Sequence, residues 1–313
     1  MTRWRSVIVC GLFLASIAAG SRDAPDAAAV HASQQPTFAS SIETVRVDVS
    51  VRQGGQAVRG LTGNDFEVVD NGVRQQITFI GLDRTPLNVV LALDMSGSVQ
   101  GTRLDQLRAA GTRLVDALGP EDTAAVVVFT ELVRIRSGFT RDRPRLLSAL
   151  VNAAAGSDTA MRDAVHAALL LGESRPGRPL VIVFSDGMDT ASFLSPELVV
   201  DTARRTEPVV YAVTSTLDER DRFLDDVVRL TGGRRLEVAS LERLSDTFAE
   251  ILSESRERYL LSYTPTGVRS GGWHDVVVRV RNRQAEVRAR PGYLARRQKA
   301  EGVSSRRTSR SPA

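Results

Sequence analysis

The chain has 313 residues, a formal net charge of +4 and a single cysteine, Cys10. One cysteine excludes a disulfide framework and a cysteine-based metal site, so the fold must be held by its hydrophobic core. The weak positive charge does not indicate a nucleic-acid-binding protein, because the basic excess is concentrated in the last residues of the chain.

The N-terminal segment has the layout of a secretory signal peptide. A positively charged start precedes an apolar stretch over residues 7–19, and a polar, alanine-rich segment follows. The stretch is short against the roughly 20 apolar residues of a membrane-spanning helix, although an uncleaved anchor stays open as an alternative. We therefore expect an exported protein (periplasmic, secreted or at the cell surface), with residues 1–20 as signal peptide and 21–37 as linker.

Residues 38–85 indicate antiparallel strands with one buried face. Residues 45–52 alternate apolar and charged side chains, which is the period of a half-buried strand. Residues 66–77 carry the dipeptide Asn71-Gly72, a strong signal for a two-residue hairpin turn.

Residues 86–256 alternate strand-like and helix-like segments, which is typical of a parallel sheet covered by helices on both faces. Only three residues separate the second and third predicted strands, too few for a crossover helix, so we expect the third strand to run antiparallel at the sheet edge. We predict a doubly wound, mostly parallel six-stranded sheet. The predicted strands are 87–93, 123–129, 133–137, 180–184, 209–213 and 235–238, and the predicted helices are 104–118, 144–154, 161–172, 196–205, 222–230 and 241–255.

Residues 257–294 return to the texture of antiparallel strands, with strands expected at 259–263, 275–280 and 285–290. Neither flank of the α/β region is long enough to form a stable sheet by itself, because a few-stranded sheet with one apolar face needs a partner. We therefore predict that both flanks pair into one small antiparallel β-domain, into which the α/β domain is inserted.

The remaining residues, 295–313, form a basic tail. From Arg296 onward it holds six basic residues against Glu301 and almost no large apolar side chain. We expect this tail to be disordered and able to contact anionic surfaces of the cell envelope.

Oxygen-bearing side chains follow two of the predicted parallel strands. Residues 94–98, Asp-Met-Ser-Gly-Ser, come after the first strand, and residues 185–187, Ser-Asp-Gly, come after the fourth. Ligands of open α/β sheets bind at such carboxyl ends, and Mg²⁺ prefers about six oxygen ligands, some of them water. We predict a site for Mg²⁺, with Mn²⁺ or Ca²⁺ as alternatives. Its ligands would be Asp94, Ser96, Ser98, Thr159 and Asp186.

This arrangement resembles the metal-ion-dependent adhesion site of von Willebrand factor type A domains. The family pattern is Asp-x-Ser-x-Ser after the first strand, a Thr in a later loop and an Asp after the fourth strand, and this chain fills all five positions. The resemblance covers residues 86–256 and implies a Rossmann-like fold. It also implies direct coordination by the hydroxyls, and coordination by the carboxylates directly or through water. Asp158 departs from the glycines usual before the Thr, and it stays open whether Asp158 also faces the ion.

The flanks are similar to those of bacterial exported proteins with a VWFA-related domain described in acidobacteria. The similar segments are residues 58–68 and 288–293, which extend the match to about 40–295. This resemblance implies an architecture and a compartment but no substrate. Together the two resemblances imply an adhesion-like binding module whose metal ion docks an Asp or Glu of an unknown partner protein.

An enzyme is the main rival class. His31, His166 and His274 are not placed to serve Ser96 as a base, and the chain has neither a Gly-x-Ser-x-Gly elbow nor a phosphate-binding loop. An aspartyl-phosphate enzyme could use Asp94, but Ser96 stands where such motifs commonly carry a second carboxylate. We expect no enzymatic activity. A structural or accessory envelope component with a vestigial metal site and, more remotely, a hydrolase are the alternatives.

Overall fold

The computed structural model describes residues 44–82, 84–97, 101–151, 156–214 and 222–295. All of them belong to one compact unit that begins at Ile42. The predicted signal peptide and linker, and the tail from residue 296 onward, lie outside the described residues, as does the predicted ligand Ser98.

The described residues form the expected six-stranded sheet, with the strand order β11-β10-β9-β6-β7-β8. Neighbouring strands run parallel except β7 and β8, which confirms the antiparallel edge strand predicted from the short connection. The central strands β6 and β7 are buried along their whole length, as continuous apolar runs require. The strands are β6 (Leu87–Asp94), β7 (Thr123–Phe129), β8 (Val133–Thr140), β9 (Arg178–Ser185), β10 (Val209–Thr214) and β11 (Arg235–Glu237).

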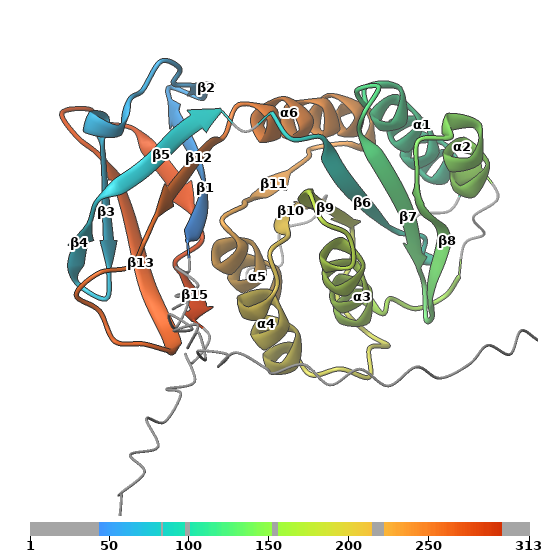
Figure 1. The fold of residues 1–313 in the computed structure, drawn as a ribbon. Coiled ribbons are helices and arrows are strands. Elements are labelled where there is room, and N and C mark those ends of the chain that lie inside the picture. The colour runs from blue at the N-terminus through green and yellow to red at the C-terminus, as the bar shows by residue number, and fades with distance from the viewer. Residues whose placement is uncertain (1–43, 83, 98–100, 152–155, 215–221, 296–313) are drawn as a thin grey trace, which may run out of the picture. The chain divides into compact units, whose positions relative to one another are not determined.

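Helices cover both faces of this sheet (Figure 1). One face packs against α1 (Thr102–Asp116), α2 (Arg143–Val151) and α6 (Leu244–Arg256), which the short 3₁₀ helix η3 (Leu241–Arg243) precedes. The other face packs against α3 (Met161–Glu173), α4 (Pro196–Arg205) and α5 (Phe223–Thr231). The predicted doubly wound fold is therefore confirmed. Within the part of the chain that the structure describes, no helix combines the length and apolar character needed to cross a membrane.

The two flanks of the α/β domain pair with each other, as predicted. β1 (Val45–Gln53) lies between β12 (Tyr259–Tyr263) and β14 (Glu286–Ala289), and β3 (Phe66–Asp70) pairs with β13 (Gly272–Val280). The resulting antiparallel sheets enclose a core that includes Val47, Val49, Phe66, Val68 and Leu261. The other strands of this β-domain are β2 (Gln56–Ala57), β4 (Val73–Gln75), β5 (Ile77–Leu82) and β15 (Gly292–Ala295), and the 3₁₀ helix η1 (Gly63–Asp65) precedes β3.

Three strands of the β-domain, β2, β5 and β15, were not predicted. The Asn71-Gly72 turn joins β3 to β4, but the chain then leaves this hairpin and β5 pairs with β12 in the other sheet. The break follows Gln75, whose buried side chain accepts a hydrogen bond from the backbone N–H of Thr266 at 2.9 Å. β15 pairs with β13, and a Cβ at Gly292 would lie within 2.5 Å of the Trp273 ring, so only glycine allows this close pairing.

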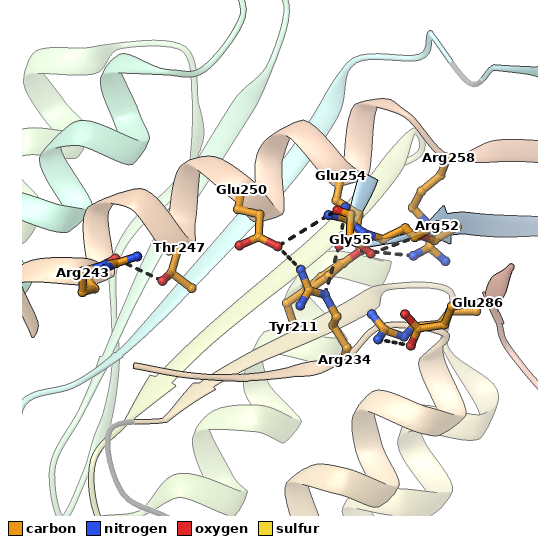
Figure 2. A network of polar contacts seen from close by, with 12 residues as sticks. Arg52, Gly55, Tyr211, Arg234, Arg243, Thr247, Glu250, Glu254, Arg258 and Glu286 are labelled. Atoms are coloured by element: carbon orange, nitrogen blue, oxygen red, sulfur yellow. Dashed lines mark hydrogen bonds and ion pairs between the residues drawn. The ribbon is translucent and has the colours of Figure 1, made fainter. Parts of the chain in front are cut away.

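A buried acid in α6 joins the α/β domain to β1. The carboxylate of Glu254, whose side chain is 2% exposed, accepts hydrogen bonds from Ser50 (3.1 Å), Arg52 (3.2 Å), Arg234 (3.0 Å) and the Tyr211 hydroxyl (2.9 Å). Figure 2 shows Arg52 and Arg234 reaching this carboxylate from separate segments. Burial raises the pKa of Tyr211 to about 12, so its hydroxyl stays protonated and donates.

A second ion pair, between buried Arg258 and partly buried Asp48, continues this network. Arg258, 1% exposed, donates to the Asp48 carboxylate, and Arg178 contacts the same carboxylate at 3.2 Å. Burial alone would raise the pKa of Asp48, but the two arginines outweigh it and hold that pKa below its usual range. The Arg258 guanidinium also donates to the carbonyl of Gly232 at 2.9 Å. The last helix of the α/β domain is thus tied to the first strand of the β-domain through paired charges.

Candidate metal centre

The two predicted carboxylate ligands lie at the ends of adjacent strands. Leu93 of β6 pairs with Phe184 of β9, so Asp94 lies beside Ser185 and close to Asp186. Asp94 is fully buried, and the side chain of Asp186 is 1% exposed. The sheet register therefore brings two buried carboxyl groups to the same edge, as the sequence predicts.

Asp94 is held by neutral hydrogen-bond donors. Its carboxylate accepts a hydrogen bond from the backbone N–H of Ser96 at 2.9 Å and one from the Ser185 hydroxyl at 2.6 Å. Burial, with a smaller contribution from the neighbouring Asp186 charge, nevertheless raises the pKa of Asp94 above its usual value. The ionised form of Asp94 is therefore disfavoured, and a bound cation would relieve that penalty.

Asp186 has a cationic neighbour on this chain. The guanidinium of Arg103, in the first turn of α1, donates to the Asp186 carboxylate at 2.7 Å. The Arg103 side chain is 48% exposed, so it reaches this buried carboxylate from solvent. The arginine supplies positive charge to one of the two predicted carboxylate ligands.

The loop that carries Thr159 is fixed between the loops that follow β6 and β9. The N–H of Gly156 donates to the carbonyl of Met95 at 2.8 Å, and the N–H of Thr190 donates to the carbonyl of Thr159 at 2.9 Å. A Cβ at Gly156 would lie 2.5 Å from the Thr130 side chain, so only glycine allows this approach. Thr159 is 5% exposed and belongs with the buried polar residues of this edge.

Asp158, the departure from the family pattern, has a different environment. It is exposed and accepts a hydrogen bond from the Ser157 hydroxyl at 3.0 Å. Of the predicted set, the structure places Asp94, Ser96, Thr159 and Asp186 at the carboxyl edge of the sheet, all buried.

The chemistry of these donors suits a hard divalent cation. Across the described ranges, no group of three or more His, Cys, Asp or Glu side chains is arranged to hold a metal ion. The predicted set differs from such groups, because it combines two carboxylates with hydroxyls. All of its donors are oxygen atoms, which Mg²⁺ and Ca²⁺ prefer.

The segment that leaves Asp186 is shaped by two further carboxylates. Asp189 accepts hydrogen bonds from the backbone and the guanidinium of Arg162 at 2.8 and 2.7 Å, and Asp163 accepts from the N–H groups of Phe193 and Leu194 at 3.0 and 2.9 Å. The Phe193 side chain is nevertheless 89% exposed. A well-anchored loop therefore presents a large apolar side chain to solvent.

Sequence reasoning did not assign roles to Ser185 and Arg103. Ser185 could have been found, because it precedes Asp186 at a strand end and parallel pairing places it beside Asp94. Arg103 gives no such signal. It lies in a helix, where an arginine is an ordinary surface residue.

Comparisons with known proteins identify the fold of this domain. Residues 89–188 match the family model of the von Willebrand factor type A domain. This region is a von Willebrand factor type A domain. The solved structure of a von Willebrand factor type A protein from Catenulispora acidiphila has the same fold, with a TM-score of 0.52 at 13% identity, over 83% of this chain and 75% of that one.

A curated relative shares part of this sequence. The chain is 25% identical to the human inter-alpha-trypsin inhibitor heavy chain H4 over 240 residues. This match covers 70% of the chain. The chain spans about a quarter of the length of that relative. Von Willebrand factor type A domains generally mediate protein–protein interaction or adhesion.

Proposed function

We propose that this chain is an exported binding protein that docks an acidic residue of a partner protein onto a divalent cation at the carboxyl ends of β6 and β9. The observation that carries the proposal is the pair of adjacent buried carboxyl groups, one of which has no ion pair with any other described residue. Mg²⁺, or alternatively Mn²⁺ or Ca²⁺, would supply there an open coordination position for a carboxylate oxygen. The ion would be held by Asp94, Ser96, Ser98, Thr159 and Asp186.

The exposed apolar side chains of the loop after Asp186 fit a partner that carries apolar side chains beside its acidic residue. Phe193 is 89% exposed and Met188 is 59% exposed on this loop. Such exposure does not stabilise the fold, whereas a buried aromatic anchor is a common source of binding energy at interfaces. We therefore expect the partner to contact Phe193 while its Asp or Glu approaches the ion.

A binding role without catalysis is supported by the positions of the histidines. The ring of His166 lies 3.2 Å from the Thr202 hydroxyl, and the ring of His274 lies 2.7 Å from Asp70 in the β-domain. Neither contacts Ser96. The exported location is supported by the N-terminal segment of the sequence, and the basic tail would add electrostatic attraction to an anionic envelope surface.

Partner capture tests this function directly. Immobilised protein is incubated with an envelope extract in Mg²⁺ or in EDTA, beside the double variant Asp94→Ala with Ser96→Ala. Asp116→Ala, an exposed acid in α1, is the matched control. We expect proteins that are retained in Mg²⁺ by the wild type and the control, released by EDTA and absent from the double variant. Equal retention in EDTA would instead favour a structural component with a vestigial metal site.

A further inference from the structure

A pocket of about 390 Å³ lies away from the metal centre, between the helices α4 and α5 and the strands β13 and β15. This volume is within the usual range for sites that bind small molecules. The pocket lies at the C-terminal end of α4, and the loop that follows Asp186 leads into the N-terminal end of the same helix. The ten residues of α4 span about 15 Å, which separates the pocket from the metal centre. The residues that matter for its chemistry are Asp201, Arg204, Arg205, Arg229, Trp273 and Leu294.

Three arginines line this pocket, and they differ in their pairing. Arg205 contacts Asp201 at 2.7 Å, and Arg229 contacts Asp226 at 2.9 Å. The side chain of Arg204 has neither a hydrogen bond nor an ion pair with another described residue. A guanidinium carries five N–H donors and no acceptor, so Arg204 can bind an anionic group of a ligand.

The acidic residues of the pocket already accept hydrogen bonds. Asp201 accepts from Arg205, and Asp275 accepts from the indole N–H of Trp273 at 2.8 Å. Each carboxylate keeps further acceptor positions, but three guanidinium groups line the pocket against two carboxylates, so hydrogen-bond donors outnumber acceptors and the net charge is positive. A ligand that carries a carboxylate fits this pocket better than a cationic one.

One wall of the pocket is apolar and rigid. The indole N–H of Trp273 is held by Asp275, its backbone carbonyl accepts a hydrogen bond from Arg269 at 2.8 Å, and Gly292 packs against its ring. Leu294, which is 47% exposed, extends the apolar surface. An aromatic ring held in this way offers its surface to a planar or apolar ligand body.

The two halves of the pocket are held together by Arg290, which lies between β14 and β15. Its guanidinium donates to the carbonyl of Thr206 at 2.8 Å, just after the end of α4. Gly232, which ends α5, approaches the backbone of Ala289 so closely that a Cβ there would lie 2.8 Å from its carbonyl carbon. The pocket is therefore pre-formed, which lowers the entropic cost of binding.

We propose that this pocket binds a small organic carboxylate with a planar, apolar body. The carboxylate contacts Arg204, assisted by the positive charge of its two arginine neighbours, and the body packs against Trp273 and Leu294. This site is separate from the proposed metal centre and does not depend on it.

The fluorescence of Trp273 provides a direct test. The sequence contains two tryptophans, so the variant Trp4→Phe leaves Trp273 as the only one. Benzoate is titrated into this variant, with benzamide as the matched neutral probe. Saturation-transfer NMR on the same mixtures gives a readout that does not depend on quenching. We expect saturable benzoate binding that is about tenfold weaker for benzamide, because the charge-assisted hydrogen bond is lost.

Two substitutions in the same background complete the test. Arg204→Ala should weaken benzoate binding about tenfold, whereas Arg113→Ala, at an exposed position in α1, should leave it unchanged. Both arginines are exposed, so neither change should alter thermal unfolding. A response to benzoate that does not saturate, or that is equal for benzamide or for Arg204→Ala, would overturn the proposal.

Discussion

The protein contains two clusters of buried or partly buried carboxylates that differ in how their charge is balanced. At the contact between α6 and β1, the carboxylates of Glu254 and Asp48 each contact at least two arginines. At the carboxyl ends of β6 and β9, Asp186 contacts Arg103, while Asp94 has only neutral donors among the described residues. The side chain of Glu254 is as deeply buried as those of Asp94 and Asp186, whereas that of Asp48 is 22% exposed. The number of arginine partners, more than the degree of burial, distinguishes the two clusters.

We interpret this difference as that between a structural ion-pair network and the proposed metal centre. Carboxylates that contact several arginines have lowered pKa values, and they hold one arrangement of the chain. The raised pKa of Asp94 shows the opposite, a charge that the folded chain alone does not stabilise. Such uncompensated groups are common at functional sites. This contrast therefore supports the proposed metal centre at the ends of β6 and β9. It also supports a structural role for the arginine network where α6 meets β1.

The largest effect is expected from breaking the structural network. Arg258→Met would leave Asp48 without its closest partner and the Gly232 carbonyl without a donor. Removing one member of a buried ion pair typically lowers the free energy of unfolding by about 3–5 kcal/mol. Chemical denaturation measures this loss, and Arg113→Ala on the exposed face of α1 should change stability by less than about 0.5 kcal/mol. A loss as small for Arg258→Met would contradict the structural role of the network.

Glu254→Gln should lower the free energy of unfolding by less, about 2 kcal/mol at neutral pH, because the amide oxygen still accepts hydrogen bonds at one of the two oxygen positions while the charge is lost. Burial would raise the pKa of Glu254, but Arg234 and its other partners outweigh it and lower that pKa. The stability that this charge supplies is therefore present above the unfolded pKa, about 4.3, and is lost as the pH falls through the folded value.

The pH dependence of Glu254→Gln provides its own control. Denaturation at several pH values should show wild-type stability falling towards that of the variant below about pH 4. A difference between the two proteins that stays constant down to acid pH would show that the carboxylate charge is not what stabilises the contact.

A smaller effect is expected where Arg103 meets Asp186. This arginine and a bound cation compete for the same carboxylate, so Arg103→Ala should tighten Mg²⁺ binding about threefold, the scale of one half-exposed ion pair. Isothermal titration measures the change, with Arg113→Ala as the matched arginine control. Weaker binding in Arg103→Ala would mean that the arginine supports the site rather than competing with the ion.

The smallest change in stability is expected for Asp94→Asn. A carboxyl group with a raised pKa destabilises the fold while it is charged, so the neutral amide removes that penalty at neutral pH. In EDTA, the free energy of unfolding of the variant should therefore lie within about 0.5 kcal/mol of the wild-type value or above it. Thermal unfolding tests this. A loss as large as that of Glu254→Gln would place Asp94 among the structural charges instead.

Much of the α/β fold could be predicted because its signals are local. Each strand of the central sheet is a short apolar run, and each helix repeats its apolar residues at helical spacing. The three residues between β7 and β8 are too few for a crossover, so they determine the direction of the edge strand. Asp94 and Asp186 could be placed together because both end parallel strands. β15 was missed because Gly292 follows Pro291, a dipeptide typical of turns.

The arginine network could not be predicted, because its partners lie far apart in the sequence. Asp48 and Arg258 are separated by 210 residues, and each occupies a position where a charged side chain is ordinary on the surface. Formation of this pair depends on how β1 meets the end of α6, which no local pattern encodes. Arg103 was missed for the same reason, since only the folded chain brings it to Asp186.

Isothermal titration of Mg²⁺ into metal-stripped protein tests the central claim most directly. The wild type is compared with Glu254→Gln and with the double variant Asp94→Ala with Ser96→Ala. We predict saturable binding to the wild type and to Glu254→Gln, and none to the double variant. If the wild type takes up no Mg²⁺, or if the double variant binds as well as the wild type, the strand ends are not a metal centre and the proposed function is wrong.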